Sequence, residues 1–467
     1  MKKASLTRRE FLGAAAMSSL AAAAVSQAPR PGATPPNFVF IMADDMGYAD
    51  LSCYGRREYR TTNIDRLAAQ GMKFMQAYAN SSVCSNTRLA LITGRYQYRL
   101  PAGLEEPIMR RNVGLPPDHP TLPSLLRKVG YSSTLVGKWH LGSLPDFSPL
   151  KSGYEHFWGF RGAALDYFTH KSQSNTDDLW DDDAKVQVPG YLTDLLGDRA
   201  VRVISEYARV RKPFLLSLHF NAPHFPFEGP GDEEESKRFA NNNGDFNTYD
   251  HGSLDTYGRM VRELDTQIGR VLQQIEASGI ANNTIVVFTS DNGGERYSDT
   301  WPFTGKKTEL LEGGLRIPAI VRWPGRVHPG STTTQVAMSM DWMPTFLAAA
   351  ATQPDPGFPL DGMNLLPALL QSAAPVPRKV FWRYRANGQQ AMRDGDMKYL
   401  KIAGNTFLFN VVNDPLERAN LRTRMPDVFA KLVDEYAAWN STLLPEDPNS
   451  NSARFTGPQL ADHYGSR

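Results

Sequence analysis

The fold is decided by the stretch Phe38-Val39-Phe40-Ile41-Met42-Ala43-Asp44-Asp45, in which six apolar residues run directly into two carboxylates. Three further apolar runs, at residues 131–136, 214–218 and 284–290, also end in polar residues. Continuous runs of this length are typical of strands buried on both faces of a parallel sheet. Helical patterns lie between them, at residues 63–70, 121–129, 192–210 and 253–278. The chain is therefore predicted to be a doubly wound α/β protein.

The polar residues after these runs indicate a site, because ligands of such sheets bind beyond the carboxyl ends of the strands. After any single strand, polar residues are explained equally well as turn formers. Four strands together favour a site. Hard oxygen ligands without a Cys or His set favour Ca²⁺ or Mg²⁺ over zinc. The residues delivered to this edge are Asp44, Asp45, Lys138, His140, His219, Asp291 and Asn292.

The composition excludes several classes of protein. The 467 residues are 41% hydrophobic, with 51 Lys+Arg against 49 Asp+Glu and only two cysteines. Disorder and a small disulfide scaffold are therefore excluded, and the length is ample for a large buried core. A formal charge of +2 gives no reason to expect nucleic acid as a partner.

Residues 1–28 are predicted to be a twin-arginine export signal. Arg8-Arg9 precedes an apolar stretch at residues 11–25, which is followed by the small residues Ser26-Gln27-Ala28. The stretch is shorter than the roughly 20 residues that span a bilayer, so we expect no stable membrane anchor. An ordinary N-terminal helix is disfavoured by the prolines that follow. We expect the twin-arginine export machinery as a partner, and a periplasmic or secreted bacterial protein.

The pattern of apolar and polar residues changes after about residue 370. Apolar and polar residues alternate at 380–385, 390–393 and 398–402, with Gly-containing turns between them. This pattern predicts a small antiparallel sheet with one solvated face, closed by a helix at 425–439. With residues 371–377 as a linker, we predict a catalytic domain at 36–370 and a C-terminal subdomain at 378–467.

The sharpest local feature is the stretch at residues 81–95, which contains Cys84 and Arg88. Ser and Asn around Cys84 are N-cap residue types, and Gly94 suits a helix end, so Cys84 is predicted to begin a helix with Arg88 one turn later. A helix N-terminus favours anions. The alternatives for Cys84 are a buried structural cysteine or a disulfide with Cys53.

At this point the sequence resembles the formylglycine-dependent sulfatases, the type I sulfatases or arylsulfatases of the alkaline-phosphatase superfamily. Their hallmark is Cys-x-Pro-Ser/Thr-Arg followed by Thr-Gly-Arg, and this chain has Cys84-Ser85-Asn86-Thr87-Arg88 and Thr93-Gly94-Arg95. The resemblance covers most of the chain. It continues through four further motifs, which are Gly137-Lys138-Trp139-His140, Ala222-Pro223-His224, Ser290-Asp291-Asn292-Gly293, and Lys307 with Glu312-Gly313-Gly314. It implies an alkaline-phosphatase-like, mixed but mainly parallel sheet between helices, with a smaller C-terminal α+β subdomain.

The resemblance also implies an activity, the hydrolysis of sulfate monoesters. Cys84 would be converted to formylglycine, whose hydrate is the nucleophile, and would join Asp44, Asp45, Asp291 and Asn292 around Ca²⁺, with Mg²⁺ as the alternative. The resemblance also implies roles for the other residues. Arg88 and Lys138 would hold the hydrate, and Lys138 and Lys307 would complement the sulfuryl oxygens. His224 with Lys307 would protonate the leaving oxygen, and His140 would take the proton of the second hydroxyl.

Three points stay open on the sequence. Asn86 stands where the family has proline, which bears on the formylglycine-generating maturation enzyme that would act here. The alternative functions are a phosphonate or phosphate ester hydrolase of the same superfamily, and a sulfated-glycan-binding protein with unmodified Cys84. The substrate is a sulfated small molecule or saccharide, and the candidate specificity segments are residues 96–111, residues 161–188 with Asp181-Asp182-Asp183, and the C-terminal sheet with Trp382 and Arg385.

Three further residues are assigned from their places in the sequence. His219 is interpreted as a core histidine, and Lys307 rather than Lys306 is assigned by its spacing to Glu312. Cys53 is then expected to be unpaired.

Overall fold

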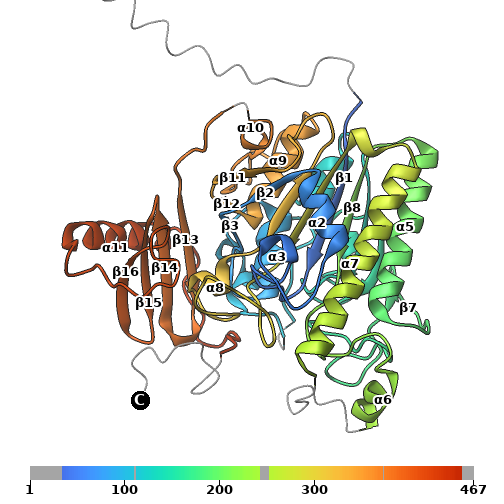
Figure 1. Cartoon of the computed structure of the whole chain (residues 1–467), viewed down its shortest axis with the longest axis horizontal. Helices are drawn as coiled ribbons and strands as arrows, with labels where there is room; N and C mark the ends of the chain where they lie inside the picture. The colour runs from blue at the N-terminus through green and yellow to red at the C-terminus, as the bar shows by residue number, and fades with distance from the viewer. Residues whose placement is uncertain (1–33, 110–111, 242–251, 372, 455–467) are drawn as a thin grey trace, which may run out of the picture. The chain divides into compact units, whose positions relative to one another are not determined.

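The computed structural model describes residues 34–109, 112–241, 252–371 and 373–454 (Figure 1). The export signal predicted for residues 1–28 lies outside the described residues. Within the described ranges, no helix combines the length and apolar character needed to cross a lipid bilayer.

A mixed, mainly parallel sheet forms the centre of the protein, as predicted. Among the described residues it has ten strands in the order β11-β2-β10-β9-β1-β8-β4-β5-β6-β7. Its five central strands are parallel, and β10, β6 and β7 pair antiparallel to their neighbours. The strands are β1 (Asn37–Ala43), β2 (Met72–Phe74), β4 (Ser132–Lys138), β5 (His156–Phe160), β6 (Trp180–Asp181), β7 (Ala184–Lys185), β8 (Phe214–His219), β9 (Thr284–Ser290), β10 (Ala319–Arg322) and β11 (Ser331–Thr333). A separate short pair joins β3 (Ala77–Tyr78) to β12 (Ala337–Met338).

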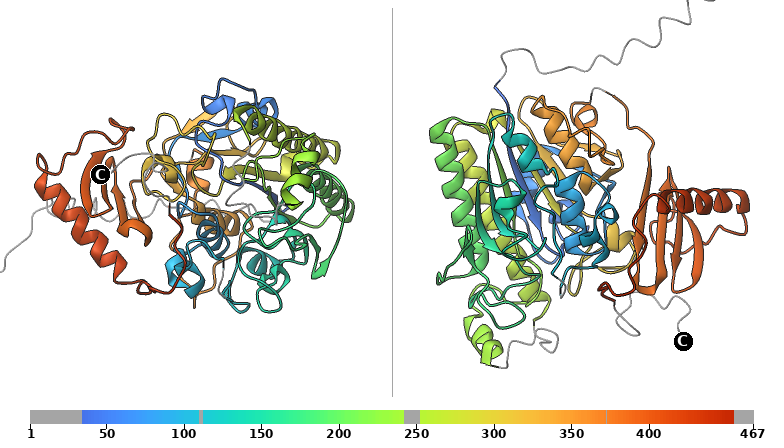
Figure 2. Two further views of the ribbon diagram at one scale, coloured as in Figure 1. Left: turned by 90° about the horizontal axis from the view of Figure 1, so that it is seen from below. Right: turned by 180° about the vertical axis from the view of Figure 1, so that it is seen from behind.

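Helices cover both faces of this sheet (Figure 2). Alternate residues of β1 enter two different apolar clusters: Val39 and Ile41 pack into one, and Phe38 and Phe40 into the other. This is why the apolar run is continuous, since a strand covered on both faces has no solvated side. The first cluster includes residues of α2 (Thr62–Ala69), α5 (Leu192–Val210) and α7 (Leu254–Ala277). The second includes residues of α3 (Cys84–Thr93), α4 (Leu122–Arg127), α9 (Trp342–Ala349) and α10 (Leu366–Leu369). Before the C-terminal sheet, the described residues also form α6 (Glu233–Asn241) and α8 (Glu312–Leu315).

The C-terminal segment forms the predicted small antiparallel sheet, which has four strands in the order β13-β14-β15-β16. One prediction about it was wrong, because neither face of this sheet is left to solvent. One face shares an apolar cluster with residues of α3 and of the segment before α8, and α11 covers the other through Leu432 and Tyr436. The elements are β13 (Lys379–Tyr384), β14 (Gln389–Asp394), β15 (Met397–Ile402), β16 (Asn405–Asn410) and α11 (Pro426–Asn440). The boundary predicted between residues 370 and 378 stays a prediction.

Trp382 anchors this sheet to the rest of the protein. Its side chain is buried, and its indole N–H donates to the Ala79 carbonyl at 2.8 Å. We expect Trp382→Ala to lower the free energy of unfolding by about 3–5 kcal/mol, because it removes a large buried ring and leaves a buried carbonyl unpaired. Trp301 is 66% exposed, so Trp301→Ala is the matched control and should change stability by less than about 0.5 kcal/mol. Urea denaturation of both variants checks this, and equal losses would contradict it.

Candidate active site

The site lies at the carboxyl edge of the central sheet. Asp44 and Asp45 follow β1 directly, and Asp291 follows the neighbouring strand β9, with Ala43 and Ser290 in register. The backbone N–H of Asp45, a residue with φ of 60°, donates to Asp291 Oδ1 at 3.2 Å. The parallel pairing of two strands far apart in the sequence therefore brings these carboxylates together.

Cys84 begins helix α3, as predicted, and Gly94 ends it with φ of 65°. The helix start differs from the prediction in one detail. Val83 occupies the N-cap position and no side chain caps the helix, so Ser and Asn near Cys84 do not have the role that their residue types predicted. Asn86 instead donates to the Gly103 carbonyl at 2.8 Å. This contact ties the start of α3 to the segment around Gly103.

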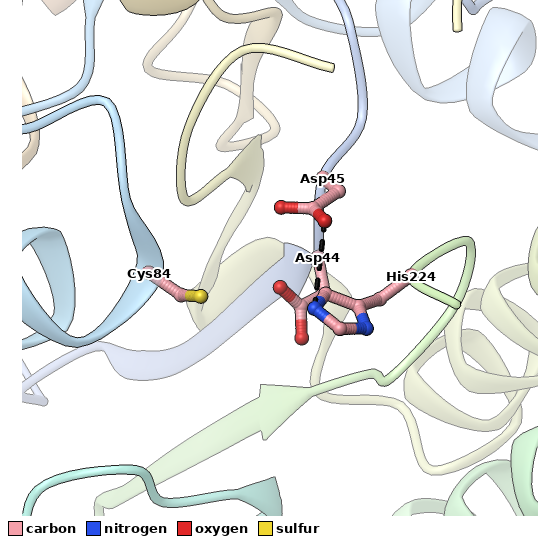
Figure 3. Close-up of side chains that lie close together, drawn as sticks. All are labelled: Asp44, Asp45, Cys84 and His224. Atoms are coloured by element: carbon pink, nitrogen blue, oxygen red, sulfur yellow. Dashed lines mark ion pairs between the residues drawn. The ribbon is translucent and has the colours of Figure 1, made fainter. Parts of the chain in front are cut away.

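Four side chains of this region come together around one point (Figure 3). Asp44, Asp45, Cys84 and His224 each offer an atom that lies within 4.8 Å of the others, and all four residues are buried. Cys84 comes from α3, the two aspartates from the end of β1, and His224 from the loop after β8. The thiol thus faces two carboxylates and an imidazole. Cys53 and Cys84 are both free cysteines, so the disulfide alternative is excluded.

Three buried cations balance the three carboxylates of the site. Lys138 Nζ contacts Asp44 Oδ2 at 2.6 Å, and Lys307 Nζ contacts Asp45 Oδ2 at 2.6 Å. Arg88 donates through Nε and Nη2 to Asp291 Oδ2 at 3.1 and 2.8 Å, and its Nη2 lies 3.7 Å from Asp44 Oδ2. Pairing of this kind is what makes so many buried charges tolerable.

The carboxylates nevertheless differ in their pKa. Burial, with repulsion from Asp291, raises the pKa of Asp44 to about 8. Burial acts in the same direction on the other two, but Lys307 with His224 holds the pKa of Asp45 well below its usual range, and Arg88 with Lys138 lowers that of Asp291. Additional positive charge beside Asp44 would relieve the repulsion that raises its pKa.

The residues present fit a divalent cation. Asp44 Oδ1 and Asn292 Oδ1 are buried oxygen atoms without a hydrogen-bond partner. Asn292 Nδ2 donates to Asp45 Oδ1 at 2.7 Å, which fixes the orientation of the amide and leaves its oxygen for a ligand. Two unpartnered hard oxygens beside two further carboxylates are the donor set that Ca²⁺ or Mg²⁺ takes.

The hydrogen bonds of His224 and His140 assign their tautomers. His224 Nδ1 donates to the Phe225 carbonyl at 2.6 Å, and its Nε2 lies 3.3 Å from Lys307 Nζ and 3.5 Å from Asp45 Oδ2. His140 Nε2 donates to the Ile108 carbonyl at 2.9 Å, while its buried Nδ1 has no partner. Burial and Lys138 hold the pKa of His140 well below its usual value. His140 therefore keeps a free lone pair on Nδ1.

His219 and Lys306 lie near the site without joining it. His219 is buried, and its Nδ1 contacts the Lys138 carbonyl at 3.2 Å. The interpretation of His219 as a core histidine holds for its position, but only one ring nitrogen is satisfied, because Nε2 has no partner. The backbone N–H of Lys306 donates to Glu309 Oε2 at 3.0 Å, whereas the neighbouring Lys307 contacts Asp45.

Three of the proposed specificity features make contacts within the protein. Trp382 is core, as described above. The acidic residues at 181–183 form ion pairs within the protein, where Asp181 binds Arg199 at 3.1 Å and Asp183 binds Arg161 at 2.6 Å. Arg385 donates to the Ser450 carbonyl and, through its backbone, to Glu106 Oε2. These contacts connect loops to one another, and the role of segments 96–111 and 161–188 in specificity stays a prediction.

Asp50 is a residue that sequence reasoning missed. Its carboxylate accepts hydrogen bonds from Gly47 N, Tyr257 Oη and Ser298 Oγ at 2.6–2.7 Å. It also accepts from Asp299 N and pairs with Arg56. Asp50 thus joins the loop after β1 to the loop after β9 and to α7. Its place six residues after Asp44 carried no recognisable signal, since its long-range donors come from two distant segments, one at Tyr257 and one at Ser298 and Asp299.

Comparison with known proteins agrees with this geometry. Residues 36–352 match the family model described as Sulfatase. The chain is 33% identical to rat (Rattus norvegicus) N-acetylgalactosamine-6-sulfatase over 388 residues, covering 78% of this chain and 71% of the relative. It is 32% identical to human (Homo sapiens) arylsulfatase A over 403 residues, covering 78% and 75%. The solved structure of Ps i-CgsB in complex with k-i-k-neocarrahexaose superposes with a TM-score of 0.80 at 29% identity, covering 90% of this chain and 95% of that one. The chain belongs to the sulfatase family, the type I sulfatases of the alkaline-phosphatase superfamily, and it is an enzyme of that family.

Proposed function

We propose that this sulfatase hydrolyses carbohydrate or aryl sulfate monoesters with Cys84, matured to formylglycine, as its nucleophilic group. The observation that carries the proposal is the position of the Cys84 thiol, buried at a helix start and facing Asp44, Asp45 and His224. A divalent cation, Ca²⁺ with Mg²⁺ as the alternative, would be held by Asp44, Asp45, Asp291, Asn292 and the matured Cys84. When bound, the cation supplies Lewis acidity that favours ionised oxygen nucleophiles.

The cations of the chain create the electrostatic field for an anionic substrate. Arg88, Lys138 and Lys307 offset the three aspartates, so a divalent ion would leave the site with a net charge of about +2. That excess favours a sulfate ester, which is a monoanion, and the negative charge that develops in its transition state. In this proposal Arg88 and Lys138 orient the matured Cys84, and Lys138 and Lys307 donate to sulfuryl oxygens.

Two histidines are suited to the proton transfers. His224 Nε2 lies 3.3 Å from Lys307 Nζ, so a proton that passes from Lys307 to Nε2 can be delivered from there to the leaving alcohol oxygen. His140 is neutral and has a free Nδ1, which suits a base that takes a proton from a hydroxyl of the matured Cys84 as the sulfate is released. Positioned acids and bases of this kind typically contribute about 10²- to 10⁴-fold.

The relatives favour a carbohydrate as the alcohol part of the substrate. One relative is named for N-acetylgalactosamine 6-sulfate chemistry, and one structural neighbour holds k-i-k-neocarrahexaose. We propose a sulfated saccharide as the substrate, a formylglycine-generating enzyme as the maturation partner, and the twin-arginine machinery as the route to the periplasm or the medium.

The test is sulfate release from a panel of defined sulfated saccharides and aryl sulfates, with an aryl phosphonate as a comparison. We expect turnover of sulfate esters, a higher kcat/KM for at least one saccharide than for the aryl ester, and a lower kcat/KM for the phosphonate. Mass analysis of the Cys84 peptide from the same active preparation should show conversion of the thiol to the aldehyde. Active enzyme with Cys84 entirely as thiol would overturn the formylglycine part of the proposal.

A further inference from the structure

The segment that carries Lys307 is held from both sides of the site. The backbone N–H of Lys307 donates to the Gly294 carbonyl at 2.9 Å, close to Asn292. The N–H of the next residue, Thr308, donates to the Ser82 carbonyl at 2.9 Å, two residues before Cys84. The Lys307 backbone therefore lies between the loop after β9 and the start of α3.

Thr308 has an unfavourable backbone conformation. Its φ of 72° places it in the left-handed region, which a β-branched residue rarely adopts because its side chain crowds the backbone. Such a conformation persists only where surrounding contacts impose it. The contacts beyond Thr308 therefore help to decide where the Lys307 ammonium lies.

Those contacts come from the C-terminal sheet, through Gln389. This residue opens β14 and is 1% exposed. Its Nε2 donates to the Thr308 carbonyl and its Oε1 accepts from the Leu310 N–H, both at 2.8 Å. One side-chain amide thus pairs with two backbone groups of the segment, as a neighbouring strand would. Figure 1 shows α8, which follows this segment, beside the C-terminal sheet.

The remainder of the segment is bound to the same sheet. Lys398 of β15 contacts Glu312 Oε1 and Glu417 Oε1, each at 2.9 Å, and the Glu312 N–H donates to Glu417 Oε2 at 2.7 Å. Leu310 and Leu311 pack into the apolar cluster of the sheet. These contacts attach residues 310–312 to the C-terminal segment. Gln389, by contrast, bonds to Thr308, the residue adjacent to Lys307.

We propose that Gln389 is a positioning residue for the catalytic step, which holds Thr308 in its strained conformation so that Lys307 Nζ stays directed at Asp45 Oδ2 and His224 Nε2. The inference rests on the proposed function, in which Lys307 and His224 assist departure of the alcohol. Gln389 touches neither substrate nor nucleophile. Its effect should therefore depend on how much the leaving group needs a proton.

The experiment compares two sulfate esters in the full-length, matured enzyme. One is 4-nitrophenyl sulfate, whose leaving group is stable as an anion, and the other is a saccharide sulfate, whose alcohol needs protonation. For Gln389→Met, which keeps the size of the side chain but removes its hydrogen bonds to Thr308, to Leu310 and to the Ala386 carbonyl, we expect kcat/KM to fall about 10- to 100-fold for the saccharide and less than about 3-fold for the aryl ester, mainly in kcat. Equal losses for both esters would mean a merely structural role and would overturn the proposal.

The neighbouring Gln390 provides a matched control. It lies in the same strand, and its Oε1 accepts from Tyr399 Oη at 3.0 Å, within the C-terminal sheet rather than from the Lys307 segment. Gln390→Met should leave the ratio of the two kcat/KM values unchanged. Gln389→Glu is a second variant in case Gln389→Met folds poorly. It keeps the acceptor for Leu310 but loses the amide donor to Thr308, so its ratio should lie between those of the wild type and Gln389→Met, and a wild-type ratio would count against the proposal.

Lys307→Met, measured in parallel, separates failure of this inference from failure of the proposed function. If Lys307→Met is selective for the saccharide ester but Gln389→Met is not, Gln389 does not position Lys307 and the proposed function stands. If Lys307→Met affects both esters equally, the leaving-group role of Lys307 is wrong.

Discussion

Replacing Cys84 by alanine is expected to abolish sulfate release, lowering kcat/KM by at least about 10³-fold, because the variant has no group that can form the covalent intermediate. The residue is 2% exposed and its thiol faces the carboxylates of the site. Alanine is smaller and apolar, so the helix that it begins should still form. The measurement is initial-rate release of sulfate at several substrate concentrations, with circular dichroism to show that the variant is folded.

Cys53 is the matched control for this experiment. It lies outside the site, and burial with the nearby Asp65 carboxylate raises the pKa of its thiol to about 12, so it is an unreactive residue at neutral pH. Cys53→Ala should retain near-native kcat/KM. Loss of activity in Cys53→Ala, or turnover by Cys84→Ala within 10-fold of the wild type, would contradict the assignment of Cys84 as the nucleophilic position.

Removing the divalent cation is expected to lower the activity by at least about 10²-fold, because the cation provides Lewis acidity and part of the positive field. It should also lower the unfolding midpoint, since an ion at 100 times its Kd stabilises the folded state by about 2.7 kcal/mol. Dialysis against a chelator, followed by titration with Ca²⁺ and Mg²⁺ separately, measures both effects. We expect Ca²⁺ to restore activity at the lower concentration.

A variant of one proposed ligand tests where the ion binds. Asp291→Ala should lose the metal, measured by elemental analysis of the purified protein, together with activity. Asp198 is the control, because it forms a solvent-exposed ion pair with Arg270 and is not among the site residues. Asp198→Ala should change neither the metal content nor the activity. Full metal content in Asp291→Ala would contradict the proposed ligand set, and unchanged activity after chelation would contradict a role for the cation.

The near-zero net charge of the chain is compatible with a site for anions because the positive groups act locally. Arg88 and Lys138 are 2% and 0% exposed, and each contacts an aspartate. Buried charges in a low dielectric interact strongly over short distances and need no basic surface around them. The overall composition therefore had no bearing on the charge of the substrate.

The strands and most helices could be predicted from the sequence because each depends on a local pattern. The continuous apolar run of β1 indicated burial on both faces, and both of its faces are covered. Cys84 at the start of a helix and Arg88 one turn later followed from a short stretch of residue types. Solvation of the C-terminal sheet was predicted wrongly, since its alternating pattern could not reveal that α11 covers the second face.

The sequence by itself determined the doubly wound architecture, the polar residues at the strand ends and, through its ordered motifs, the family. Only the tertiary structure decided which of these groups meet: Lys307 with Asp45, Arg88 with Asp291, and Gln389 with the backbone beside Lys307. The physical reason is that an apolar period acts over a few neighbouring residues, whereas hydrogen bonds and ion pairs join groups up to 262 residues apart in this site. Such contacts depend on how strands and loops pack in space, and no local pattern records them.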